Sequence, residues 1–439
     1  MEQRGLIFTK ENCISCNKCV RVCTSPGASY LEERGEGGVV QIHEDRCIAC
    51  GACFSLCEHD ARDYLDDTEA FFADLQAGEP ISLLLAPSFM ATYWQEYGSI
   101  LGGLKKLGVK RIISVSFGAD ICTWAYIKYM QEHDFYGGIS SSCPVVVSYA
   151  EHLQPELIPR LMPVHRPMMC AAIYCKEELG ITDKLAFLGP CIGKRLETME
   201  KGSYVDYNVT FLKFMRYVRK HGIYGEDTSD EVESGLGNFY PAPGGLSYNL
   251  RWFLGDDLFL REVSGKTYLY GWLRQNGKEI LGDENPFALI DALNCRNGCI
   301  EGTASEMGGF KEDRALAYVV EMKKRVKRKE EGSPWNASLS QEERLRLFNL
   351  QFASLDLTHY LRTFTDRSAA CQIRYPSPEE AEEIFLSMHK ATPESRQINC
   401  ATCGYRSCYQ LMVAIYNRLN TKKSCIHYNS QEAIRLERL

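Results

Sequence analysis

The sequence lacks the features that would carry a chain through or into a membrane. It begins MEQRGLIFTK, without the apolar core of a secretory signal peptide, and its longest apolar stretch, Ile81 to Tyr93, is interrupted by Ser82, Pro87 and Ser88. The net charge of −7 at pH 7 also lacks the basic excess typical of nucleic-acid-binding proteins. We therefore expect a cytoplasmic protein with neither a membrane nor a nucleic acid as its partner.

Cysteine, in contrast, is abundant, at 20 of 439 residues. Cytoplasmic proteins keep their thiols reduced, so these cysteines are expected to be metal ligands more often than disulfide partners. The length of the chain and its hydrophobic content of 45% predict two to four domains with large packed cores.

Two cysteine runs near the N-terminus share the spacing C-x-x-C-x-x-C-x-x-x-C; they are Cys13, Cys16, Cys19 and Cys23, then Cys47, Cys50, Cys53 and Cys57. This spacing is typical of two-cluster bacterial ferredoxins, in which the fourth cysteine of one run ligates the cluster of the other. It predicts one [4Fe–4S] cluster completed by Cys57 and a second completed by Cys23. Zinc is the alternative, but a third cysteine in a duplicated run fits zinc poorly. The proline that often follows the fourth cysteine is missing, since Thr24 and Glu58 stand there.

A third cysteine set lies near the C-terminus and comprises Cys400, Cys403, Cys408 and Cys425. Its spacing suits both zinc and a [4Fe–4S] cluster. The presence of the two N-terminal runs in the same chain favours a [4Fe–4S] cluster.

The central part of the chain alternates short apolar runs with helical periodicity. The runs predict buried strands at residues 81–86, 111–117, 184–188 and 287–290, with a helix over 93–107. This alternation indicates an α/β sheet buried on both faces. We expect domains at residues 1–75, 76–390 and 391–439.

Four further cysteines sit beside proline or glycine, where the backbone can approach a ligand closely. They are Cys143, Cys191, Cys295 and Cys299. Two of their segments follow predicted strands, where open α/β sheets bind ligands. The remaining cysteines stand in ordinary helical or strand-like text and are interpreted as small buried side chains; they are Cys122, Cys170, Cys175 and Cys371.

The segments around these four cysteines read SSSCP, GPCIGKRLE and NCRNGCIEG. In order and character they resemble the three signature motifs of the [FeFe]-hydrogenase catalytic domain. The segments YPAPGGL (240–246) and APS (86–88) are similar to two further parts of that domain. The resemblance implies an α/β catalytic domain of the [FeFe]-hydrogenase type, an N-terminal α+β ferredoxin-like domain and a small, mostly helical C-terminal Fe–S domain.

The resemblance also implies the cofactors. Cys143, Cys191, Cys295 and Cys299 would hold the [4Fe–4S] part of an H-cluster, and Cys299 would bridge to a two-iron subcluster bearing CO, cyanide and an azadithiolate. Three accessory [4Fe–4S] clusters would carry electrons. The implied reaction is the reversible conversion of protons and electrons into H₂, in which the cofactor does the difficult chemistry and the protein tunes it.

Several other residues acquire roles by the same resemblance. Lys194 matches the lysine that contacts a cyanide ligand, because an ammonium group can donate to an anionic diatomic. Pro87 and Ser88 would line the other cyanide. Gly189 and Met168 stand where the family usually has a methionine and a glutamine near the cofactor.

The chain departs from the usual catalytic members along the proton path. Ser142 replaces a cysteine that relays protons, and a thiol, with a pKa of about 8.5, exchanges protons near neutral pH more readily than a serine hydroxyl. The stretch 121–130, which corresponds to the helix that carries relay carboxylates, contains no acid, and Met162 replaces a serine. These departures resemble the sensory branch of the family and predict low turnover with a regulatory role.

Three alternatives to a catalytic hydrogenase remain open. They are a sensor that reports H₂ or redox state, a Narf-like iron–sulfur protein without the two-iron subcluster, and a ferredoxin fused to an unrelated domain. The expected partners are H₂ and protons, a redox protein such as a ferredoxin, a signalling protein and the maturation proteins that build the two-iron unit.

Overall fold

The computed structural model describes residues 5–34, 37–200, 202–228, 235–306, 310–327 and 332–437. They divide into two compact units. The first comprises Met1–Leu65, Glu151–Pro155 and Asp366–Leu439, and the second comprises Asp66–Ala150 and Glu156–Thr365. The N-terminal and C-terminal cysteine sets therefore belong to the same compact unit.

The second unit begins earlier than the domain boundary expected after residue 75. Helix α3 (Thr68–Gln76) packs against strand β9 (Tyr207–Thr210) and helix α10 (Phe211–His221). The ring of Phe72 stacks on Phe214 and Tyr217, with centroid distances of 5.7 and 3.9 Å. Burial of such aromatic rings stabilises α3 within the second unit.

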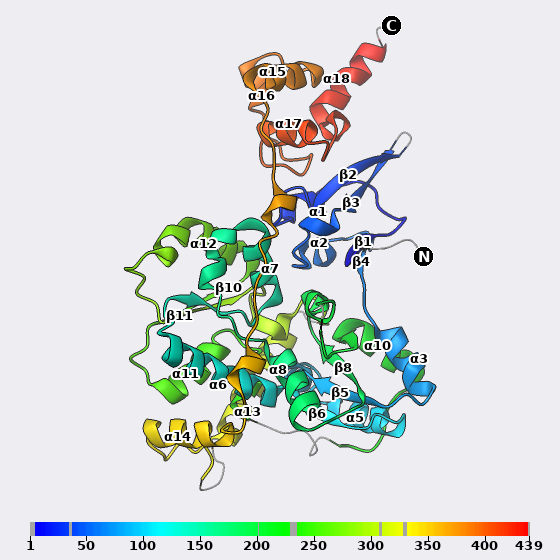
Figure 1. The fold of residues 1–439 in the computed structure, drawn as a ribbon. Helices are drawn as coiled ribbons and strands as arrows, with labels where there is room; N and C mark the ends of the chain where they lie inside the picture. The colour runs from blue at the N-terminus through cyan, green and yellow to red at the C-terminus, as the bar shows by residue number, and fades with distance from the viewer. Residues whose placement is uncertain are drawn as a thin grey trace. The chain divides into compact units, whose positions relative to one another are not determined.

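The main sheet of the second unit has four parallel strands in the order β6-β5-β8-β9. The new strands are β5 (Ile81–Leu85), β6 (Ile112–Ser114) and β8 (Lys184–Gly189). Every residue of β5 is buried, as expected for a strand covered on both faces. Helix α8 (Pro167–Ile173) contacts β5, while α3 and α10 pack on β9 (Figure 1). The predicted α/β class is confirmed.

A second parallel sheet has the order β10-β11-β7, with β10 at Leu260–Ser264, β11 at Leu289–Leu293 and β7 at Gly138–Ile139. The strands predicted at 81–86 and 184–188 thus belong to the four-stranded sheet, whereas the strand predicted at 287–290 belongs to the second sheet.

The strand predicted over 111–117 is wrong in its second half, because helix α6 (Val115–His133) begins there. The Ser114 hydroxyl accepts a hydrogen bond of 3.2 Å from the Ser116 amide, which caps the helix. The helix cap at Ser114 thus outweighs the preference of Val115 and Phe117 for a strand, and this segment is helical.

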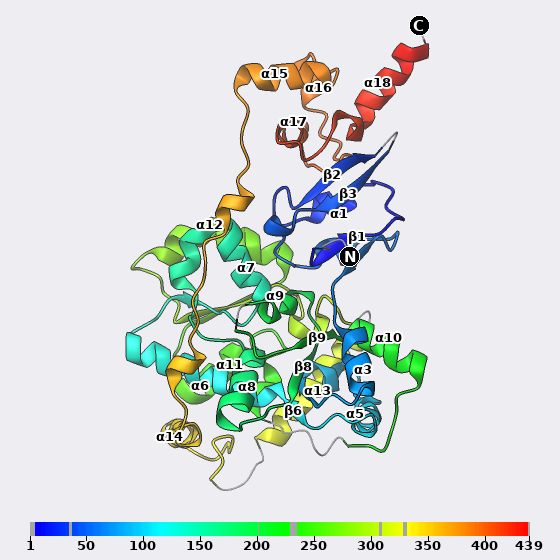
Figure 2. The ribbon, with the colours of Figure 1, turned by 45° about the vertical axis from the view of Figure 1, so that its right-hand side comes forward.

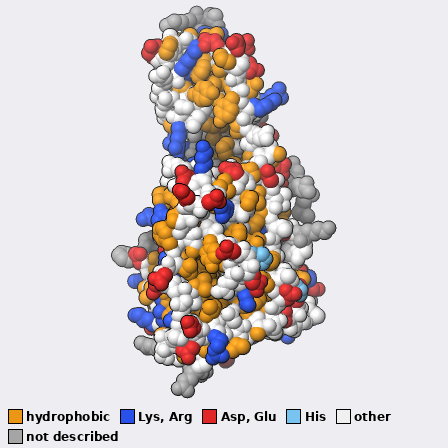
Figure 3. Space-filling model, turned by 60° about the vertical axis from the view of Figure 1, so that its left-hand side comes forward, with side chains coloured by type: hydrophobic (Ala, Val, Ile, Leu, Met, Phe, Trp, Pro, Cys, Tyr) orange, Lys and Arg blue, Asp and Glu red, His pale blue; other side chains and the backbone are white. Residues whose placement is uncertain are grey.

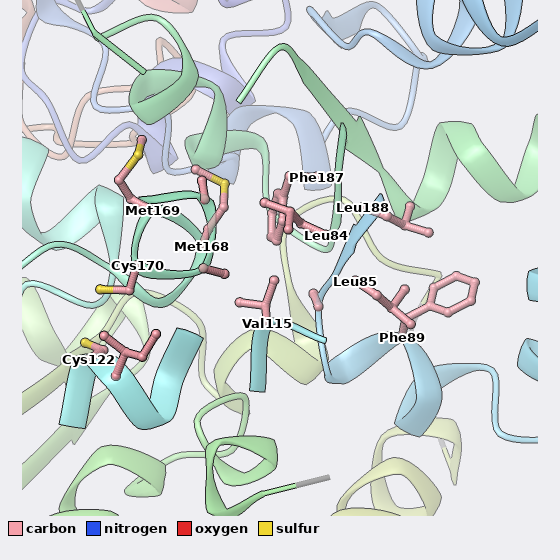
Figure 4. Close-up of a cluster of buried hydrophobic side chains, with 14 of the residues drawn as sticks. Leu84, Leu85, Phe89, Val115, Cys122, Met168, Met169, Cys170, Phe187 and Leu188 are labelled. Atoms are coloured by element: carbon pink, nitrogen blue, oxygen red, sulfur yellow. The ribbon is translucent and has the colours of Figure 1, made fainter. Parts of the chain in front are cut away.

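The second unit holds further helices (Figure 1). They are α4 (Ser88–Thr92), α5 (Tyr97–Lys106), α9 (Arg195–Thr198), α11 (Gly245–Leu254), α12 (Lys266–Leu281), α13 (Phe310–Val326) and α14 (Gln341–Gln351). Of these, α4 and α9 contact the first sheet, and α11 and α12 contact the second. Helix α7 (Pro144–Leu153) begins in this unit, and its last residues belong to the first. Figure 4 shows part of the buried core of this unit, which includes Cys122, Met168 and Cys170.

The N-terminal part of the first unit is built from two antiparallel strand pairs and two short helices. Strand β1 (Ile7–Thr9) pairs with β4 (Arg62–Tyr64), and β2 (Ser29–Arg34) pairs with β3 (Gly37–Ile42). Helices α1 (Lys18–Val22) and α2 (Ala52–Ser55) lie within the two cysteine runs and contain their third cysteines, Cys19 and Cys53. The backbone repeats as well, since Ser15 and Asn17 have positive φ angles and so do the equivalent Ala49 and Gly51.

The C-terminal part of the first unit is helical, with α15 (Pro378–Ser387), α16 (Pro393–Arg396), α17 (Cys408–Tyr416) and α18 (Ile426–Glu437). Figure 2 shows α15, α16 and α17 grouped together, with α18 extending from them. None of the helices in the described residues has both the length and the apolar character of a membrane-spanning segment.

The packing of β5 predicts a large effect of truncation at Leu84, which is fully buried. We expect Leu84→Ala to destabilise the second unit by about 2–5 kcal/mol, because it removes apolar contacts and leaves a cavity. Thermal unfolding followed by circular dichroism measures the effect. Leu179→Ala, at a side chain that is 55% exposed, is the control and should leave the midpoint almost unchanged.

Candidate metal centres

Cys13, Cys16, Cys19 and Cys57 line one small cavity in the first unit. The second cysteine run thus contributes Cys57 to the first set, in the arrangement that the spacing predicts. Two N–H groups donate to its sulfurs: the Ala61 amide to Cys57 Sγ at 3.3 Å and the Arg62 guanidinium to Cys19 Sγ at 3.2 Å. Such donors stabilise thiolates that bind a cluster.

Cys23, Cys47, Cys50 and Cys53 line a separate cavity of similar size. Burial raises the pKa of the Cys23 thiol to about 11 and that of Cys47 to about 12. A buried thiol in such a site becomes a thiolate only when a cation compensates its charge, so a metal cluster suits this donor set.

The third set is partly assembled around Cys403. Burial raises the pKa of the Cys403 thiol, and the neighbouring Cys425 and Cys400 raise it further. Cys408, at the start of α17, packs with Phe385, Met412 and Val413 in an adjoining hydrophobic cluster. The contacts of the first unit therefore join three members of this set and place the fourth beside them.

The loop that carries the third set lies against the loop of the first run. The Arg21 guanidinium donates to the Ala401 carbonyl, and the Asn17 amide donates to Ser424 Oγ at 3.4 Å. Gly404, at φ +90°, approaches so closely that a Cβ atom there would lie 2.8 Å from the Asn17 carbonyl oxygen. The two sets of donors are thus neighbours within the first unit.

In the second unit, the four central cysteines follow the carboxyl ends of strands. Cys191 lies two residues after β8 and Cys295 two residues after β11. Cys143 follows β7 and directly precedes α7, and Cys299 lies in a short 3-10 helix, Gly298–Glu301. Carboxyl ends of parallel strands are where α/β sheets bind ligands.

Backbone hydrogen bonds hold the loops of these cysteines together. The Cys299 amide donates to the Pro241 carbonyl at 2.7 Å, and the Ala304 amide donates to the Pro190 carbonyl at 2.8 Å. A Cβ atom on Gly298 would lie 2.1 Å from the Pro241 oxygen, so this close approach requires glycine.

The four central thiols act on one another electrostatically. Burial raises the pKa of Cys191 to about 11 and that of Cys299 to about 12, and Cys143 raises both further. The pKa of Cys295 is raised by burial and by the other three thiols. The set therefore resists ionisation alone but fits a cluster whose irons supply positive charge.

No three His, Cys, Asp or Glu side chains among the described residues converge as a single bound metal ion would require. The ligands of a [4Fe–4S] cluster need not converge in this way, because they bind different irons.

Lys194 lies beside this set and belongs to a buried ion network. Its ammonium group lowers the pKa of Cys191 and Cys299, where burial is the larger, opposing effect. It also donates to Glu197 at 2.7 Å, and the Arg166 guanidinium lies 3.4 Å from the same carboxylate oxygen. Burial acts to raise the pKa of Glu197, but Arg166 and Lys194 together hold it below its ordinary value.

Pro87 and Ser88 lie at the same sheet edge as Gly189, because β5 and β8 are paired in parallel and the Ala86 amide donates to the Leu188 carbonyl at 3.0 Å. The Ser88 hydroxyl is buried without a hydrogen-bond partner in the described chain. Helix α4, which Ser88 begins, contacts the 3-10 helix of Cys299. An orphaned buried hydroxyl at this place suits a polar ligand.

Gly189 and Met168 are the two remaining positions that the sequence predicts near the cofactor. A Cβ atom on Gly189 would lie 2.2 Å from the Phe187 ring, so the phenylalanine occupies the space beside this glycine. Met168 is fully buried in the hydrophobic core, in the region drawn in Figure 4.

Ser142 lies beside the buried hydroxyl of Tyr126. Burial raises the pKa of Tyr126, and its hydroxyl accepts a hydrogen bond of 2.9 Å from the Ser141 amide. The Ser142 hydroxyl is buried without a hydrogen-bond partner in the described chain. The neighbouring Ser141 hydroxyl donates to the Val164 carbonyl at 2.9 Å. The described neighbours of Tyr126 at this place are therefore hydroxyl groups rather than carboxylates.

Sequence reasoning missed several residues of these sites. Glu197 and Arg166 complete the network of Lys194, and Arg62 bonds a ligand of the first set. Asp120, just outside the stretch without acids, is buried on α6 and accepts from the Gly237 amide at 2.8 Å. Of these residues, only Glu197 could have been identified from the sequence, because it lies in the segment GPCIGKRLE.

Comparison with known proteins matches two parts of this chain. Residues 79–259 match the family "Iron only hydrogenase large subunit, C-terminal domain", and residues 12–61 match the "4Fe-4S dicluster domain". The chain therefore combines a hydrogenase-like α/β domain with a two-cluster iron–sulfur domain, and the expected fold class is confirmed.

The chain is also similar to two curated proteins named "Cytosolic Fe-S cluster assembly factor NAR1". That of Encephalitozoon cuniculi is 24% identical over 240 residues, 48% of this chain and 64% of that protein. That of Scheffersomyces stipitis is 28% identical over 118 residues, 24% of this chain and 22% of that protein. The matches thus span less than two thirds of either relative.

Among solved structures, the [FeFe]-hydrogenase HydA1 from Chlamydomonas reinhardtii aligns over 69% of this chain and all of its own, with 14% identity and a TM-score of 0.48. A structure of HydA described by stepwise H-cluster assembly gives the same identity, coverage and TM-score.

The ion network predicts a pH-dependent effect of Glu197→Gln. The variant removes the carboxylate that Arg166 and Lys194 share, leaving Arg166 only the more distant Glu200 at 3.9 Å, and should destabilise the second unit by about 3 kcal/mol at pH 7. Because the folded-state pKa of Glu197 is lowered, its contribution is present above the ordinary value of about 4.3 and is lost as the pH falls further.

Thermal unfolding at pH 7 and at acidic pH measures the difference between Glu197→Gln and the unmodified protein. The matched control is Glu58→Gln, at an exposed carboxylate paired with Lys18. Equal destabilisation by the two variants at pH 7 would contradict the role of the buried network.

Proposed function

We propose that this protein binds an H-cluster and converts or senses H₂ at low turnover, with three accessory [4Fe–4S] clusters as its electron relay. The observation that carries the proposal is the set Cys143, Cys191, Cys295 and Cys299, whose thiols act on one another, with the Lys194 ammonium beside it. Four thiols supply the ligands of a [4Fe–4S] cluster, and an ammonium can donate to an anionic diatomic ligand.

When bound, the cofactor supplies the reversible chemistry of H₂, protons and electrons. The chain's residues would bind and surround it. Cys299 would bridge its two parts, and Lys194, held in place by Glu197, would donate to one cyanide. Ser88, whose buried hydroxyl lacks a partner in the described chain, would donate to the other.

Proton delivery is the step that this chain supports least. At the relay position stands Ser142, and its neighbour Tyr126 has a raised pKa because of burial. Both hydroxyls hold their protons tightly near neutral pH, so proton transfer through them is slow. This favours a regulatory role over rapid catalysis.

The proposed partners follow from these sites. Electrons would pass through the N-terminal and C-terminal cysteine sets to a redox protein such as a ferredoxin, and a signalling protein would read the state of the cofactor. Maturation proteins would deliver the two-iron unit. We place the protein in the cytoplasm, without nucleic acid or membrane as a partner; one face of it carries basic and acidic side chains interspersed (Figure 3).

A second candidate function is iron–sulfur cluster assembly, which the names of the two curated relatives favour. A protein of this kind would hold [4Fe–4S] clusters without the two-iron unit. The two functions differ in whether CO and cyanide ligands are present.

Infrared spectroscopy of the full chain, reconstituted with iron and sulfide and loaded with the two-iron unit, distinguishes them. We expect CO and cyanide bands that shift under H₂, and we expect Cys299→Ala to abolish them because the bridging thiolate is lost. Cys175→Ala, at a buried thiol outside the four sets, is the control and should keep the bands. Absent bands in a protein whose iron is fully accounted for by [4Fe–4S] clusters would support the assembly function instead.

Replacement of the relay hydroxyl tests the cause of low turnover. Ser142→Cys should raise the rate of H₂ production, by up to about 100-fold, because a thiol exchanges protons more readily at neutral pH. Ser141→Cys is the matched control, since that neighbouring hydroxyl is committed to the Val164 carbonyl. An unchanged rate in Ser142→Cys would contradict Ser142 as the limiting group.

A further inference from the structure

The side chain of Arg62 is buried and lines the cavity of the first cysteine set of the N-terminal domain. It begins strand β4, pairs with Thr9 of β1 and is only 2% exposed. One guanidinium nitrogen donates to Thr9 Oγ1 and another donates to Cys19 Sγ at 3.2 Å. The guanidinium therefore reaches the first set directly.

Strand β4, which Arg62 begins, contacts helix α2, which carries Cys53 of the second set. The charge of Arg62 lowers the pKa of Cys19 in the first set and those of Cys47 and Cys53 in the second, against the larger effect of burial in each case. In turn, Cys19, Cys53 and Cys13 raise the pKa of Arg62, against the desolvation that acts to lower it. One cation thus interacts with ligands of both sets.

The burial of this cation needs an anionic partner. Among the described residues, no Asp or Glu forms a salt bridge with Arg62, and its side-chain hydrogen bonds go to a hydroxyl and a sulfur. A buried charge without a counter-ion is costly, so buried charges are paired or lie at metal sites. Thiolate-ligated clusters carry the negative charge that the guanidinium lacks elsewhere.

We propose that the positive charge of Arg62 raises the reduction potentials of both N-terminal clusters. A fixed positive charge stabilises the reduced, more negative state of a nearby cluster, and an N–H···S hydrogen bond acts in the same direction. The first cluster receives both effects and the second only the charge. The pair can then hold two electrons at a less negative ambient potential, which suits a two-electron reaction.

The proposal rests on the iron–sulfur part of the proposed function and does not require the two-iron unit. Its test is a redox titration of the full chain, reconstituted with iron and sulfide, and monitored by electron paramagnetic resonance. Spin–spin interaction identifies the neighbouring reduced clusters of the first unit, and the signal that is lost in Cys403→Ser belongs to the third set. Infrared bands of CO and cyanide, in contrast, decide the H-cluster independently.

Arg62→Met should lower the midpoint potentials of both N-terminal clusters, with the larger shift at the first. Arg62→Lys, which keeps the charge, should show a smaller shift of both. Lys18→Met is the matched control, because Lys18 lines the same cavity as the first set but is 45% exposed and paired with Glu58. Solvent screens such a charge, so its removal should leave both potentials unchanged.

Unchanged potentials in Arg62→Met, or equal shifts in Arg62→Met and Lys18→Met, would overturn the proposal. If Arg62→Met fails to retain iron, Arg62→Gln takes its place, since it removes the charge and keeps N–H donors. Potentials in Arg62→Gln equal to those of the unmodified protein would then show that the charge has no role.

Discussion

The burial of cysteine thiols in groups is the constraint on which the rest of this structure depends. Burial raises the pKa values of Cys23, Cys47, Cys191 and Cys299 far above neutrality, and neighbouring thiols raise most of them further. Such groups are stable as thiolates only with positive charge among them. Metal binding and folding are therefore linked in both units, as is general for proteins whose ligands must lose protons to bind.

The protein places a few fixed cations beside these groups. Arg62 bonds a ligand of the first N-terminal set, and Lys194 lies beside the central set. The two cations are held differently. Lys194 shares Glu197 with Arg166, so its charge is partly compensated, whereas the described chain offers Arg62 no carboxylate. The first arrangement orients a donor, and the second leaves its charge to act on the clusters.

The polar groups near the central set are the basis of the proposal that the protein senses H₂ and turns it over slowly. Ser142 and Tyr126 lie where acidic or thiol relays would be expected, and Phe187 fills the space beside Gly189. The third cysteine set lies against the first within one compact unit, through the contacts of Asn17 and Arg21. The loops of the third and first cysteine sets are therefore neighbours within that unit.

The sequence by itself determined the metal-ligand pattern and the α/β class, because cysteine spacing and apolar runs are local and read directly from neighbouring residues. It predicted the exchange of Cys23 and Cys57 and the positions of β5 and β8, but not the start of α6, where the hydroxyl of Ser114 caps a helix within β-favouring text. Only the tertiary structure decided which cations meet the cysteines, since Arg62 reaches Cys19, and Arg166 reaches Glu197, across many residues of chain. It also decided that α3 packs in the second unit and that the two ends of the chain form one unit. Such contacts depend on how separate elements pack, which no local pattern encodes.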